Sequence, residues 1–469
     1  MKDTKKRVES RQLLMEGYPQ EKRVELKNKA GALSASSTSE NYGNKRCENT
    51  DRLLEKILSG GNLNAAYKRV KANKGSCGID GMTVVELLQY LKQNGGVIRE
   101  LVLAGTYNPK PVRRIEIPKP DSGVRLLGIP TVLDRVIQQA ILQVLAPIYE
   151  EEFSENSFGF RPKRNAHQSI NKSKRYIEEG YDWTVDIDLA KFFDTVNHDK
   201  LMRLLSEKIK DCRLLSLIRK YLQSGVMVNG VVIDTDEGTP QGGNLSPLLS
   251  NIMLNELDKE LIKRGLKFCR YADDANIYVK SQKAAKRVMG SITRFIEQKL
   301  KLKVNKTKSS VDRPWKLKFL GFSFYRKEEG IRIRAHQKSV NKLKLKLKTA
   351  TGRSNSMSIS QRMLKLKRIT TGWINYFRIA DMRCLIGQLD KWLRRRLRMC
   401  IWKQWKRTKT RFNNLVRLGM NKFKAHEWSN TRKGYWRIAN SPILSTTLTK
   451  NFLKTLGFQS MYERYSLVA

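Results

Sequence analysis

The stretch Phe268-Cys-Arg-Tyr-Ala-Asp-Asp-Ala-Asn-Ile277 places two adjacent carboxylates, Asp273 and Asp274, between two apolar runs. Alternation of apolar residues on both sides predicts two short strands within Lys267–Lys280, with the acids at the turn between them. Two neighbouring carboxylates repel each other, and a divalent metal ion is their natural counter-charge. A solvated Asp-Asp turn is the alternative for an isolated pair.

A second acidic strand supports the metal interpretation. Val185-Asp-Ile-Asp-Leu-Ala-Lys-Phe-Phe-Asp194 embeds Asp186 and Asp188 in apolar residues, and side chains two apart share one face of a strand. A buried Asp needs a ligand or a partner. Three carboxylates from two strands can hold two Mg²⁺ ions about 3.5–4 Å apart, which activate an attacking hydroxyl and stabilise leaving phosphate oxygens. This pattern is typical of nucleotidyl transfer.

The overall charge indicates a polyanionic substrate. The 469 residues include 92 Lys and Arg against 44 Asp and Glu, a net charge of +48. This excess argues against small neutral substrates and favours nucleic acid, with an anionic membrane as the weaker alternative. No run of 18 apolar residues exists and Met1–Gln20 has no apolar block, so we expect neither a membrane span nor a secretory signal. Six scattered Cys without a CxxC pattern and four His argue against a zinc module and for free thiols.

The excess charge lies mostly near the C-terminal end. Residues 331–469 carry 33 basic and 4 acidic side chains, a net charge of +29, whereas residues 51–330 carry 48 and 33. Small polar residues within 31–40 predict that residues 1–50 are a poorly ordered basic extension. We therefore expect a catalytic body over 51–330 and a polyanion-binding region over 331–469.

Helices and strands alternate without regular βαβ units, so the sequence predicts the α+β class. The expected strands, including one hairpin ahead of the acidic stretches, are Arg113–Pro118, Val124–Ile129, Trp183–Leu189 and the pair within Lys267–Lys280. The expected helices are Asp134–Phe153, Asp199–Leu222, Pro247–Arg264, Ser281–Leu300, Arg362–Phe377 and Leu389–Lys406. Ser339–Lys348 is ambiguous, because Leu343, Leu345 and Leu347 fit an alternating strand or one side of a helix. Arg411–Ala469 is less regular.

Tyr271-Ala-Asp-Asp274 resembles the signature of reverse transcriptases, and further blocks resemble those of bacterial group II intron-encoded reverse transcriptase/maturases in the same order. These blocks are Ile117-Pro-Lys-Pro120, Leu127-Gly-Ile-Pro130, Asp134-Arg-Val-Ile-Gln-Gln139, Ser157-Phe-Gly-Phe-Arg-Pro162, Gly238-Thr-Pro-Gln-Gly-Gly243, Leu245-Ser-Pro-Leu248, Leu320-Gly-Phe322 and Gly372-Trp-Ile-Asn-Tyr-Phe377. No Cys/His cluster follows them, so the chain resembles the compact class without an HNH nuclease domain. The resemblance implies a right-hand polymerase, with fingers and palm over 51–330, a helical thumb/maturase domain over 331–408 and a small DNA-binding domain over 409–469.

The resemblance also implies roles for the acidic residues. Asp188, Asp273 and Asp274 would be the catalytic metal ligands, with the carbonyl of Leu189 nearby. Asp188 is preferred to Asp186 because Phe193 follows it by five residues, as the aromatic residue that checks the sugar does in the family. Phe193 would exclude a 2′-hydroxyl and so favour dNTPs, while a plain core position is its alternative. His198 is expected to begin a helix or to pack, not to act as a base.

Four further residues are implied around the nucleotide. Lys119 and Arg125 would grip the triphosphate, Gln241 would support the incoming nucleotide, and Lys308 would assist the pyrophosphate. Lys306 competes with Lys308 for that role, and solvated surface charge is the alternative for the cations.

Template, primer and RNA contacts are implied at three places. Arg113 and Arg114 would contact template phosphates or be ordinary exposed charges on a strand. Phe319, Leu320 and Gly321 would grip the primer end or form a buried strand turn. On the Leu389–Lys406 helix, an apolar stripe through Leu393 and Leu397 leaves an arginine face that would bind RNA, made of Arg394, Arg395 and Arg398.

These implications describe an RNA-directed DNA polymerase that extends a DNA primer on an RNA template, using dNTPs and two Mg²⁺ ions that Mn²⁺ can replace. As a maturase it would bind its parent intron RNA and assist splicing and retrohoming into target DNA. It would act as a monomer or homodimer in the bacterial cytoplasm, in a nucleoid-associated ribonucleoprotein. Two alternatives stay open: a splicing cofactor with a vestigial polymerase, disfavoured by the intact acids, and a domesticated reverse transcriptase, disfavoured by Gly372–Phe377 and the basic tail.

Overall fold

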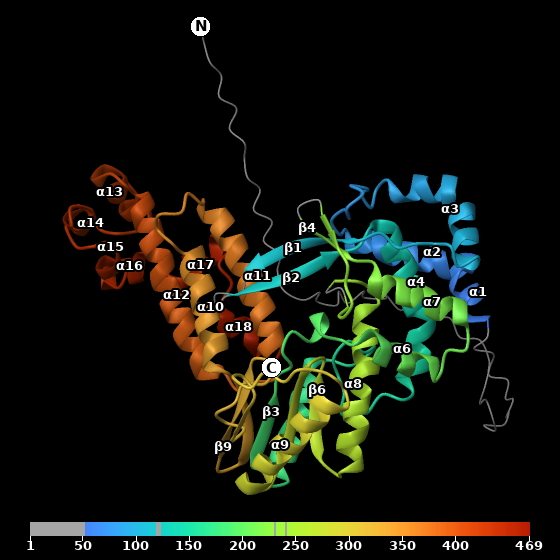
Figure 1. Ribbon diagram of the computed structural model, residues 1–469. Coiled ribbons are helices and arrows are strands. Elements are labelled where there is room, and N and C mark those ends of the chain that lie inside the picture. Colours follow the sequence, from blue (N-terminus) through green and yellow to red (C-terminus); the bar gives the residue numbers. More distant parts are fainter. Residues whose placement is uncertain (1–51, 119–122, 229–230, 240–241) are drawn as a thin grey trace, which may run out of the picture. The chain divides into compact units, whose positions relative to one another are not determined.

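The computed structural model describes residues 52–118, 123–228, 231–239 and 242–469 (Figure 1). The expected extension over 1–50 and the site residues Lys119 and Gln241 lie outside these described residues. The described part combines mostly antiparallel sheets with many helices, which confirms the α+β class. Its cysteines are free thiols, as expected. No helix in this part is both long enough and apolar enough to cross a bilayer.

One sheet carries both acidic stretches, and we call it the acidic sheet. Its four antiparallel strands run in the order β6 (Lys267–Tyr271), β7 (Asp274–Val279), β3 (Trp183–Ile187) and β8 (Ser310–Asp312). Tyr271 pairs with Asp274, so Ala272 and Asp273 form a two-residue turn between β6 and β7. The predicted strand, acidic turn and returning strand are confirmed.

The acidic sheet is buried on both faces. Phe268 and Ile277 belong to a core shared with the helices of the N-terminal half, whereas Cys269 and Tyr278 belong to a second core shared with the C-terminal helices. Neighbouring residues of a strand point to opposite faces, so β6 and β7 each contribute to both cores. This double burial holds the strand ends, and therefore the acids, in place.

A second sheet contains the predicted hairpin. Its strands run in the order β2 (Val124–Ile129), β1 (Val112–Pro118), β4 (Val226–Val228) and β5 (Val231–Ile233). β1 and β2 are antiparallel, from the Arg113–Ile129 pair to the Pro118–Val124 pair, which confirms the hairpin. β4 pairs with β1 in parallel and was not expected, because a strand of three residues is too short to show alternation.

Helices surround these sheets in the first two thirds of the chain. They are α1 (Leu53–Ile57), α2 (Gly60–Asn73), α3 (Leu87–Leu103), α4 (Val132–Glu150), α5 (Ala166–Glu178), α6 (His198–Ser206), α7 (Cys212–Gln223), α8 (Ser246–Lys263) and α9 (Gln282–Gln298), with the 3₁₀ turn η2 (Phe192–Asp194). The single helix expected over Asp199–Leu222 is wrong, because α6 ends and α7 starts anew. The Asp211 carboxylate accepts hydrogen bonds from the N–H groups of Arg213 and Leu214, and such a cap favours a new helix start over continuation.

The C-terminal third is predominantly helical. A β9–β10 hairpin (Phe322–Lys327 and Gly330–Ala335) leads into α10 (Gln337–Ala350), α11 (Ile359–Phe377) and α12 (Arg383–Gln404). In Figure 1, α10 and α11 lie side by side. The stretch expected to be less regular is a series of short helices: α13 (Thr408–Arg417), α14 (Lys422–Ser429), α15 (Tyr435–Ile438), α16 (Pro442–Thr447), α17 (Lys450–Thr455) and α18 (Met461–Ser466).

The ambiguous lysine-rich segment belongs to helix α10. Val340, Leu343 and Leu347 are buried, whereas Leu345 is 64% exposed. A strand would have placed Leu343, Leu345 and Leu347 on one face, so the exposure of Leu345 is the signature of the helical period. The helical alternative is therefore confirmed.

Candidate active site

The three carboxylates expected to bind metal lie at one end of the acidic sheet. Asp273 lies in the turn between β6 and β7, and Asp274 is the first residue of β7. Asp188 follows the last residue of β3, which pairs with β7 as far as Ile187 and Ala275. Residues 85 positions apart in the sequence therefore meet at one sheet end because β3 and β7 are paired neighbours.

The negative charges of neighbouring carboxylates raise the pKa values of Asp273 and Asp274, in addition to the effect of burial. Burial, followed by the negative charges of Asp273 and Asp188, raises the pKa of Asp274 to about 6. Burial also raises the pKa of Asp273, with Asp188 adding to the effect. Within β3, the pKa of Asp186 is raised to about 7 by burial and then by Asp274 and Asp188. A cation bound among these groups would relieve their mutual repulsion.

Cationic and amide side chains border the acids. Asn305 donates from Nδ2 to the Asp188 carboxylate at 3.0 Å, and Nζ of Lys308 lies 3.9 Å from the same carboxylate. The positive charges of Lys318 and Lys308 partly offset the rise in the pKa of Asp274 that burial and the neighbouring carboxylates cause. Of the two lysines that competed in the sequence, Lys308 is the one paired with a catalytic candidate. Lys318 was missed, because nothing in its local sequence distinguishes it from other surface lysines.

The donor chemistry of this group fits a divalent metal ion. Carboxylate oxygens are the donors that Mg²⁺ prefers, and their repulsion calls for a positive charge. Within the described residues, no three His, Cys, Asp or Glu side chains are already gathered as a metal-binding cluster. Leu189 is buried, and its backbone pairs with Val304. The fit therefore rests on the type of donors and on their repulsion.

A glycine sits directly against the acidic turn. A Cβ added to Gly159 would lie 2.8 Å from the carbonyl carbon of Tyr271 and even closer to the nitrogen of Ala272. Ala272 itself has a left-handed φ of 56°. The glycine in the block Ser157–Pro162 is therefore needed so that this segment can lie flat against the turn that carries Asp273.

A buried ion pair supports the same turn. Arg270 and Asp258 are both fully buried and form two hydrogen bonds of 2.8 and 2.6 Å. Arg270 also donates from Nη1 to the carbonyl of Ala272 and to Asn251 Oδ1, each at 3.0 Å. Asn251 in turn donates to the carbonyl of Gly159 at 2.9 Å. These contacts tie α8, the Gly159 segment and the acidic turn together.

Sequence reasoning missed Arg270, Asp258, Asn251 and Gly159 as parts of the site. A signal was present for one of them, since Arg270 stands in a strand of apolar residues, and a buried charge requires a partner. The partner, Asp258, could not be identified because it lies on helix α8, one acid among several there.

Phe193 occupies the segment that follows Asp188. Phe192 fills the core, and Phe193 is half-buried beside it, with the ring centroids 5.2 Å apart. The carbonyl of Phe193 accepts a hydrogen bond from Thr239 N–H at 2.6 Å, and His198 Nε2 lies 2.6 Å from the Gly238 carbonyl oxygen. His198 begins α6 and is buried, as expected. The start of the Gly238–Gly243 loop is thus anchored beside Phe193.

The predicted hairpin cations have different surroundings. Arg125 is exposed on β2, and its positive charge partly offsets the rise that burial causes in the pKa of Asp273. Arg113 and Arg114 are consecutive on β1, so they point to opposite faces and do not share one phosphate. Nε of Arg113 is buried without a hydrogen-bond partner, and burial, with a small contribution from the charge of Arg113, lowers the pKa of Arg135.

The expected primer-grip residues form a tight turn braced by the C-terminal helices. Phe319 and Phe322 exchange backbone hydrogen bonds, and Leu320 and Gly321 between them have φ values of 49° and 86°. The Leu320 carbonyl accepts from Tyr376 Oη at 2.8 Å. The Gly321 carbonyl accepts from Ser339 Oγ at 2.9 Å. The two residues are thus held by α10 and α11, which the local sequence did not indicate.

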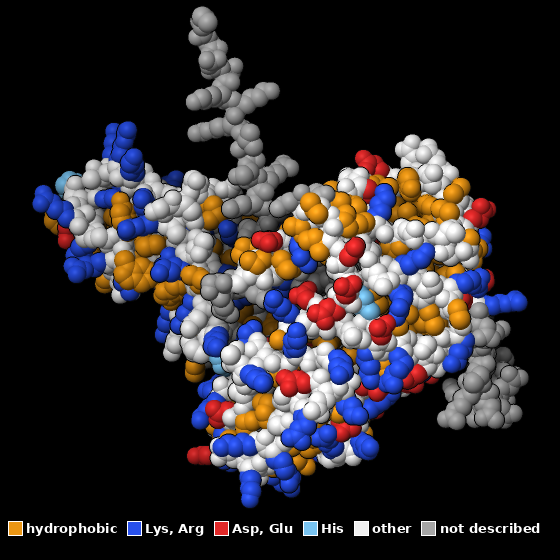
Figure 2. All heavy atoms as spheres, in the orientation of Figure 1, with side chains coloured by type: hydrophobic (Ala, Val, Ile, Leu, Met, Phe, Trp, Pro, Cys, Tyr) orange, Lys and Arg blue, Asp and Glu red, His pale blue; other side chains and the backbone are white. Residues whose placement is uncertain are grey.

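The arginine face of α12 is also present. Leu393, Leu397, Cys400 and Ile401 are buried as the expected stripe. Arg394, Arg395 and Arg398 line a cavity on the other side of the helix. Figure 2 shows many Lys and Arg side chains and hardly any acidic ones over α13–α16, while Asp and Glu gather near the middle of the face drawn. The cavity lined by these arginines shares no residue with the acidic site.

Comparison with known families matches two models in succession. "Reverse transcriptase (RNA-dependent DNA polymerase)" matches residues 117–324, which include the three carboxylates. "Group II intron, maturase-specific domain" matches residues 340–419, which include α10, α11 and α12. Reverse transcriptases generally use divalent metal ions, in agreement with the carboxylate group.

Curated relatives agree with these matches. Protein YkfC of Escherichia coli (strain K12) is 34% identical over 300 residues, which cover 55% of this chain and 79% of the relative. Group II intron-encoded protein LtrA of Lactococcus lactis subsp. cremoris is 40% identical over 230 residues, 47% of this chain and 36% of the relative. A putative COX1/OXI3 intron 2 protein of Saccharomyces cerevisiae is 34% identical over 226 residues, 47% of this chain and 26% of the relative.

The matched segment thus covers most of protein YkfC but only about a third or less of the two intron-encoded proteins. With a polymerase model and a maturase model matched in this order, the chain belongs to the family of group II intron-encoded reverse transcriptases and maturases.

Proposed function

We propose that this chain is an RNA-directed DNA polymerase that extends a DNA primer on an RNA template by two-metal-ion nucleotidyl transfer. The observation that carries the proposal is the meeting of Asp188, Asp273 and Asp274 at one end of the acidic sheet, with Lys308 3.9 Å from Asp188. Acids that repel one another beside cations suit a reaction in which metal ions and phosphate oxygens must be held together.

Asp188, Asp273 and Asp274 hold two Mg²⁺ ions, which Mn²⁺ can replace, and Leu189 offers its carbonyl to the same place. When bound, the ions lower the pKa of the primer 3′-hydroxyl and neutralise charge on the leaving pyrophosphate. Lys308 adds positive charge beside the carboxylates, where the pyrophosphate leaves. Arg125 is exposed, and its positive charge acts on the pKa of Asp273. Arg125 binds the triphosphate of the incoming dNTP.

Substrate selection falls to residues around this centre. Phe193, half-buried and fixed through its own carbonyl, packs under the sugar and excludes a 2′-hydroxyl. Lys119 and Gln241, outside the described residues, complete the triphosphate and nucleotide contacts. Arg113 and Arg114 serve the template strand from opposite faces of β1. The turn made by Phe319, Leu320 and Gly321 holds the primer end.

The basic C-terminal third provides the maturase function. Residues 331–408 form the thumb and maturase domain, which binds the parent intron RNA through Arg394, Arg395 and Arg398 and assists splicing. Residues 409–469 bind target DNA during retrohoming. The net charge of +29 over 331–469 supports a nucleic-acid partner, because phosphate contacts dominate such affinities. The protein works in the bacterial cytoplasm, in a nucleoid-associated ribonucleoprotein.

Primer extension on an RNA template with dNTPs and Mg²⁺ tests the polymerase. Wild type is compared with Asp273→Asn/Asp274→Asn and with Asp199→Asn, a matched control on α6 whose side chain is 83% exposed. We expect cDNA from wild type and the control only, with binding of structured RNA retained by all three. A folded wild type that binds RNA but makes no cDNA would contradict the polymerase and leave the splicing cofactor.

A further inference from the structure

A basic cavity of about 610 Å³ lies beside α12, apart from the acidic site. One wall is a single face of α12, with residues spaced three and four apart: Lys391, Arg394, Arg395 and Arg398. The facing wall comes from the segment around α16 and α17 and consists of Asn440, Ser445, Thr449, Lys450 and Asn451. The cavity therefore joins a helix matched by the maturase model to residues beyond that match.

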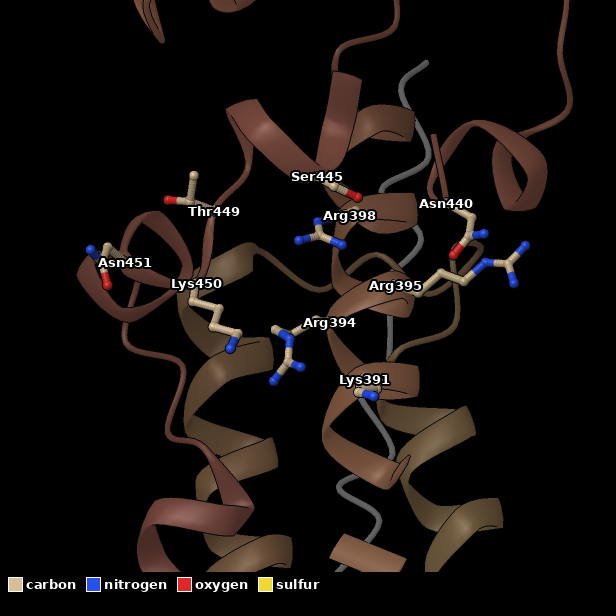
Figure 3. A pocket seen from close by; sticks show the side chains of 9 residues that line it. All are labelled: Lys391, Arg394, Arg395, Arg398, Asn440, Ser445, Thr449, Lys450 and Asn451. Atoms are coloured by element: carbon tan, nitrogen blue, oxygen red, sulfur yellow. The ribbon is translucent and has the colours of Figure 1, made fainter. Parts of the chain in front are cut away.

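Three of the cations share one space. Figure 3 shows Arg394, Arg398 and Lys450 pointing into the gap between α12 and α17, whereas Arg395 extends to the other side of α12. Arg398 donates from Nε to the Leu448 carbonyl at 3.1 Å, which fixes its stem and leaves its terminal nitrogens toward the cavity. The geometry thus presents several N–H donors to one occupant.

Apart from the pair of Arg394 with Asp390, the described residues offer no anionic partner to the cations that line the cavity. The lining holds five cationic side chains and no acidic one. The nearby Asp390, 4.0 Å from Arg394, is buried and already accepts hydrogen bonds from Ser460, Met461 and Tyr462. Burial, and after it the positive charge of Arg394, lowers the pKa of Arg398. A phosphate group would relieve this repulsion and use the free donors.

An aromatic platform borders the same face. The Arg395 guanidinium lies 3.9 Å from the ring centroid of Trp436 and donates to the Trp436 carbonyl at 2.9 Å. Trp436 is 39% exposed. Unpaired nucleobases stack on aromatic rings and on guanidinium planes held in this way. A base can therefore be recognised on one flank of α12 while phosphates are bound at Arg394, Arg398 and Lys450 on the other.

We propose that this cavity seats an unpaired segment of RNA, with its phosphates at Arg394, Arg398 and Lys450 and one base on the Arg395–Trp436 platform. Its volume falls in the range of roughly 300–1,000 Å³ of pockets that bind one small ligand, so it has room for a nucleotide. An unpaired segment is favoured because the platform needs a free base face, which a double helix does not offer. The hydroxyl of Ser445, which lines the cavity, can pair with a 2′-hydroxyl, which favours RNA over DNA. The inference rests on the proposed RNA binding and specifies an unpaired RNA segment as what this cavity binds.

The test measures binding of the full chain to short fluorescent nucleic acids by anisotropy over a salt series. The probes are a single-stranded RNA, the same sequence as DNA, and a fully paired RNA hairpin. The variants are Lys450→Gln, Trp436→Ala and the matched control Lys283→Gln, an exposed lysine on α9 outside the cavity and outside the basic C-terminal third. Lys450 and Lys283 are both exposed, so neither change should unfold the chain.

For single-stranded RNA we expect Lys450→Gln to weaken binding about five- to tenfold and to reduce the salt slope by about 0.7, the value for one lost phosphate contact. Trp436→Ala should weaken it about tenfold without changing the slope, because stacking involves no charge. Lys283→Gln should match wild type. Equal losses for the paired hairpin would overturn the unpaired segment, and losses confined to single-stranded DNA would overturn RNA.

The outcome is separable from that of the proposed polymerase. Wild-type primer extension reports the acidic site, whereas the anisotropy losses report the cavity. No cDNA together with cavity-dependent RNA binding would refute the polymerase and keep this inference. Normal cDNA together with unchanged RNA binding in Lys450→Gln and Trp436→Ala would refute this inference alone.

Discussion

Replacing Gly159 with Ala should damage catalysis through a shift of the acidic turn. The added Cβ would lie 2.8 Å from the Tyr271 carbonyl carbon, whereas carbon atoms pack at about 3.5–4.0 Å. The turn must therefore retreat by at least about 0.7 Å, and further to clear the Ala272 nitrogen. Because Asp273 and Asp274 belong to this turn, their carboxylates move with it.

A displacement of about 1 Å at reacting groups costs roughly 100-fold in rate. We expect kcat for primer extension to fall by about that factor, with a stability loss of about 1–3 kcal/mol from overpacking. Binding of structured RNA should stay unchanged, because the basic helices lie in another part of the chain.

Gly290→Ala is the matched control. Gly290 lies in α9, and a Cβ there would meet nothing within 4 Å, so the change should leave kcat alone and stabilise the helix by about 0.5–1 kcal/mol. Single-turnover primer extension and chemical denaturation measure both variants. A folded Gly159→Ala protein with wild-type kcat would refute the reasoning that this glycine sets the position of the turn.

Three further outcomes are expected. Arg270→Ala leaves Asp258 buried without its counter-charge and should lower the free energy of unfolding by about 3–5 kcal/mol in urea denaturation; a loss below about 1 kcal/mol would contradict a structural ion pair. In metal-free protein, the folded-state pKa values of Asp186 and Asp274, about 7 and about 6, exceed the unfolded value of about 3.9. The folded state therefore binds more protons than the unfolded state between pH 4 and 7, so the free energy of unfolding should fall as pH rises through that window. Asp186→Asn should flatten this decline and raise the melting temperature at pH 7.5 in EDTA. An unaltered pH profile in this variant would count against the raised pKa of Asp186. Phe193→Ala should raise the use of rNTPs relative to dNTPs by roughly 10–200-fold in kcat/KM, whereas an unchanged ratio accompanied by lower stability would assign Phe193 to the core.

The local pattern was sufficient to predict the central part of the fold. Apolar alternation around Asp273 and Asp274 predicted two strands and a turn, because the two-residue repeat of a strand can be recognised from residues adjacent in the sequence. The hairpin of β1 and β2 followed from the same rule. The Tyr271–Asp274 signature and the ordered blocks led to the family, which the comparisons confirmed. The individual roles of these site residues remain predictions.

Other features could not be read locally. The strand-like alternation of Leu343, Leu345 and Leu347 proved helical, because burial of Leu343 and Leu347 against neighbouring helices outweighed the pattern. The break between α6 and α7 depended on Asp211 acting as a cap, a choice that a continuous apolar period does not reveal. Strands of three residues such as β4 carry too little alternation to detect.

The sequence by itself determined the kind of chemistry, since three acids in strand contexts and a net charge of +48 point to metal-dependent work on nucleic acid. Only the tertiary structure decided what holds those acids in place. The contacts of Gly159 with the acidic turn and of Arg270 with Asp258 join segments from different elements, and a single sequence does not encode which distant residues will be neighbours. The cavity beside α12 likewise exists only because α17 folds back against it, so that Lys450 meets Arg394 and Arg398 across a shared space.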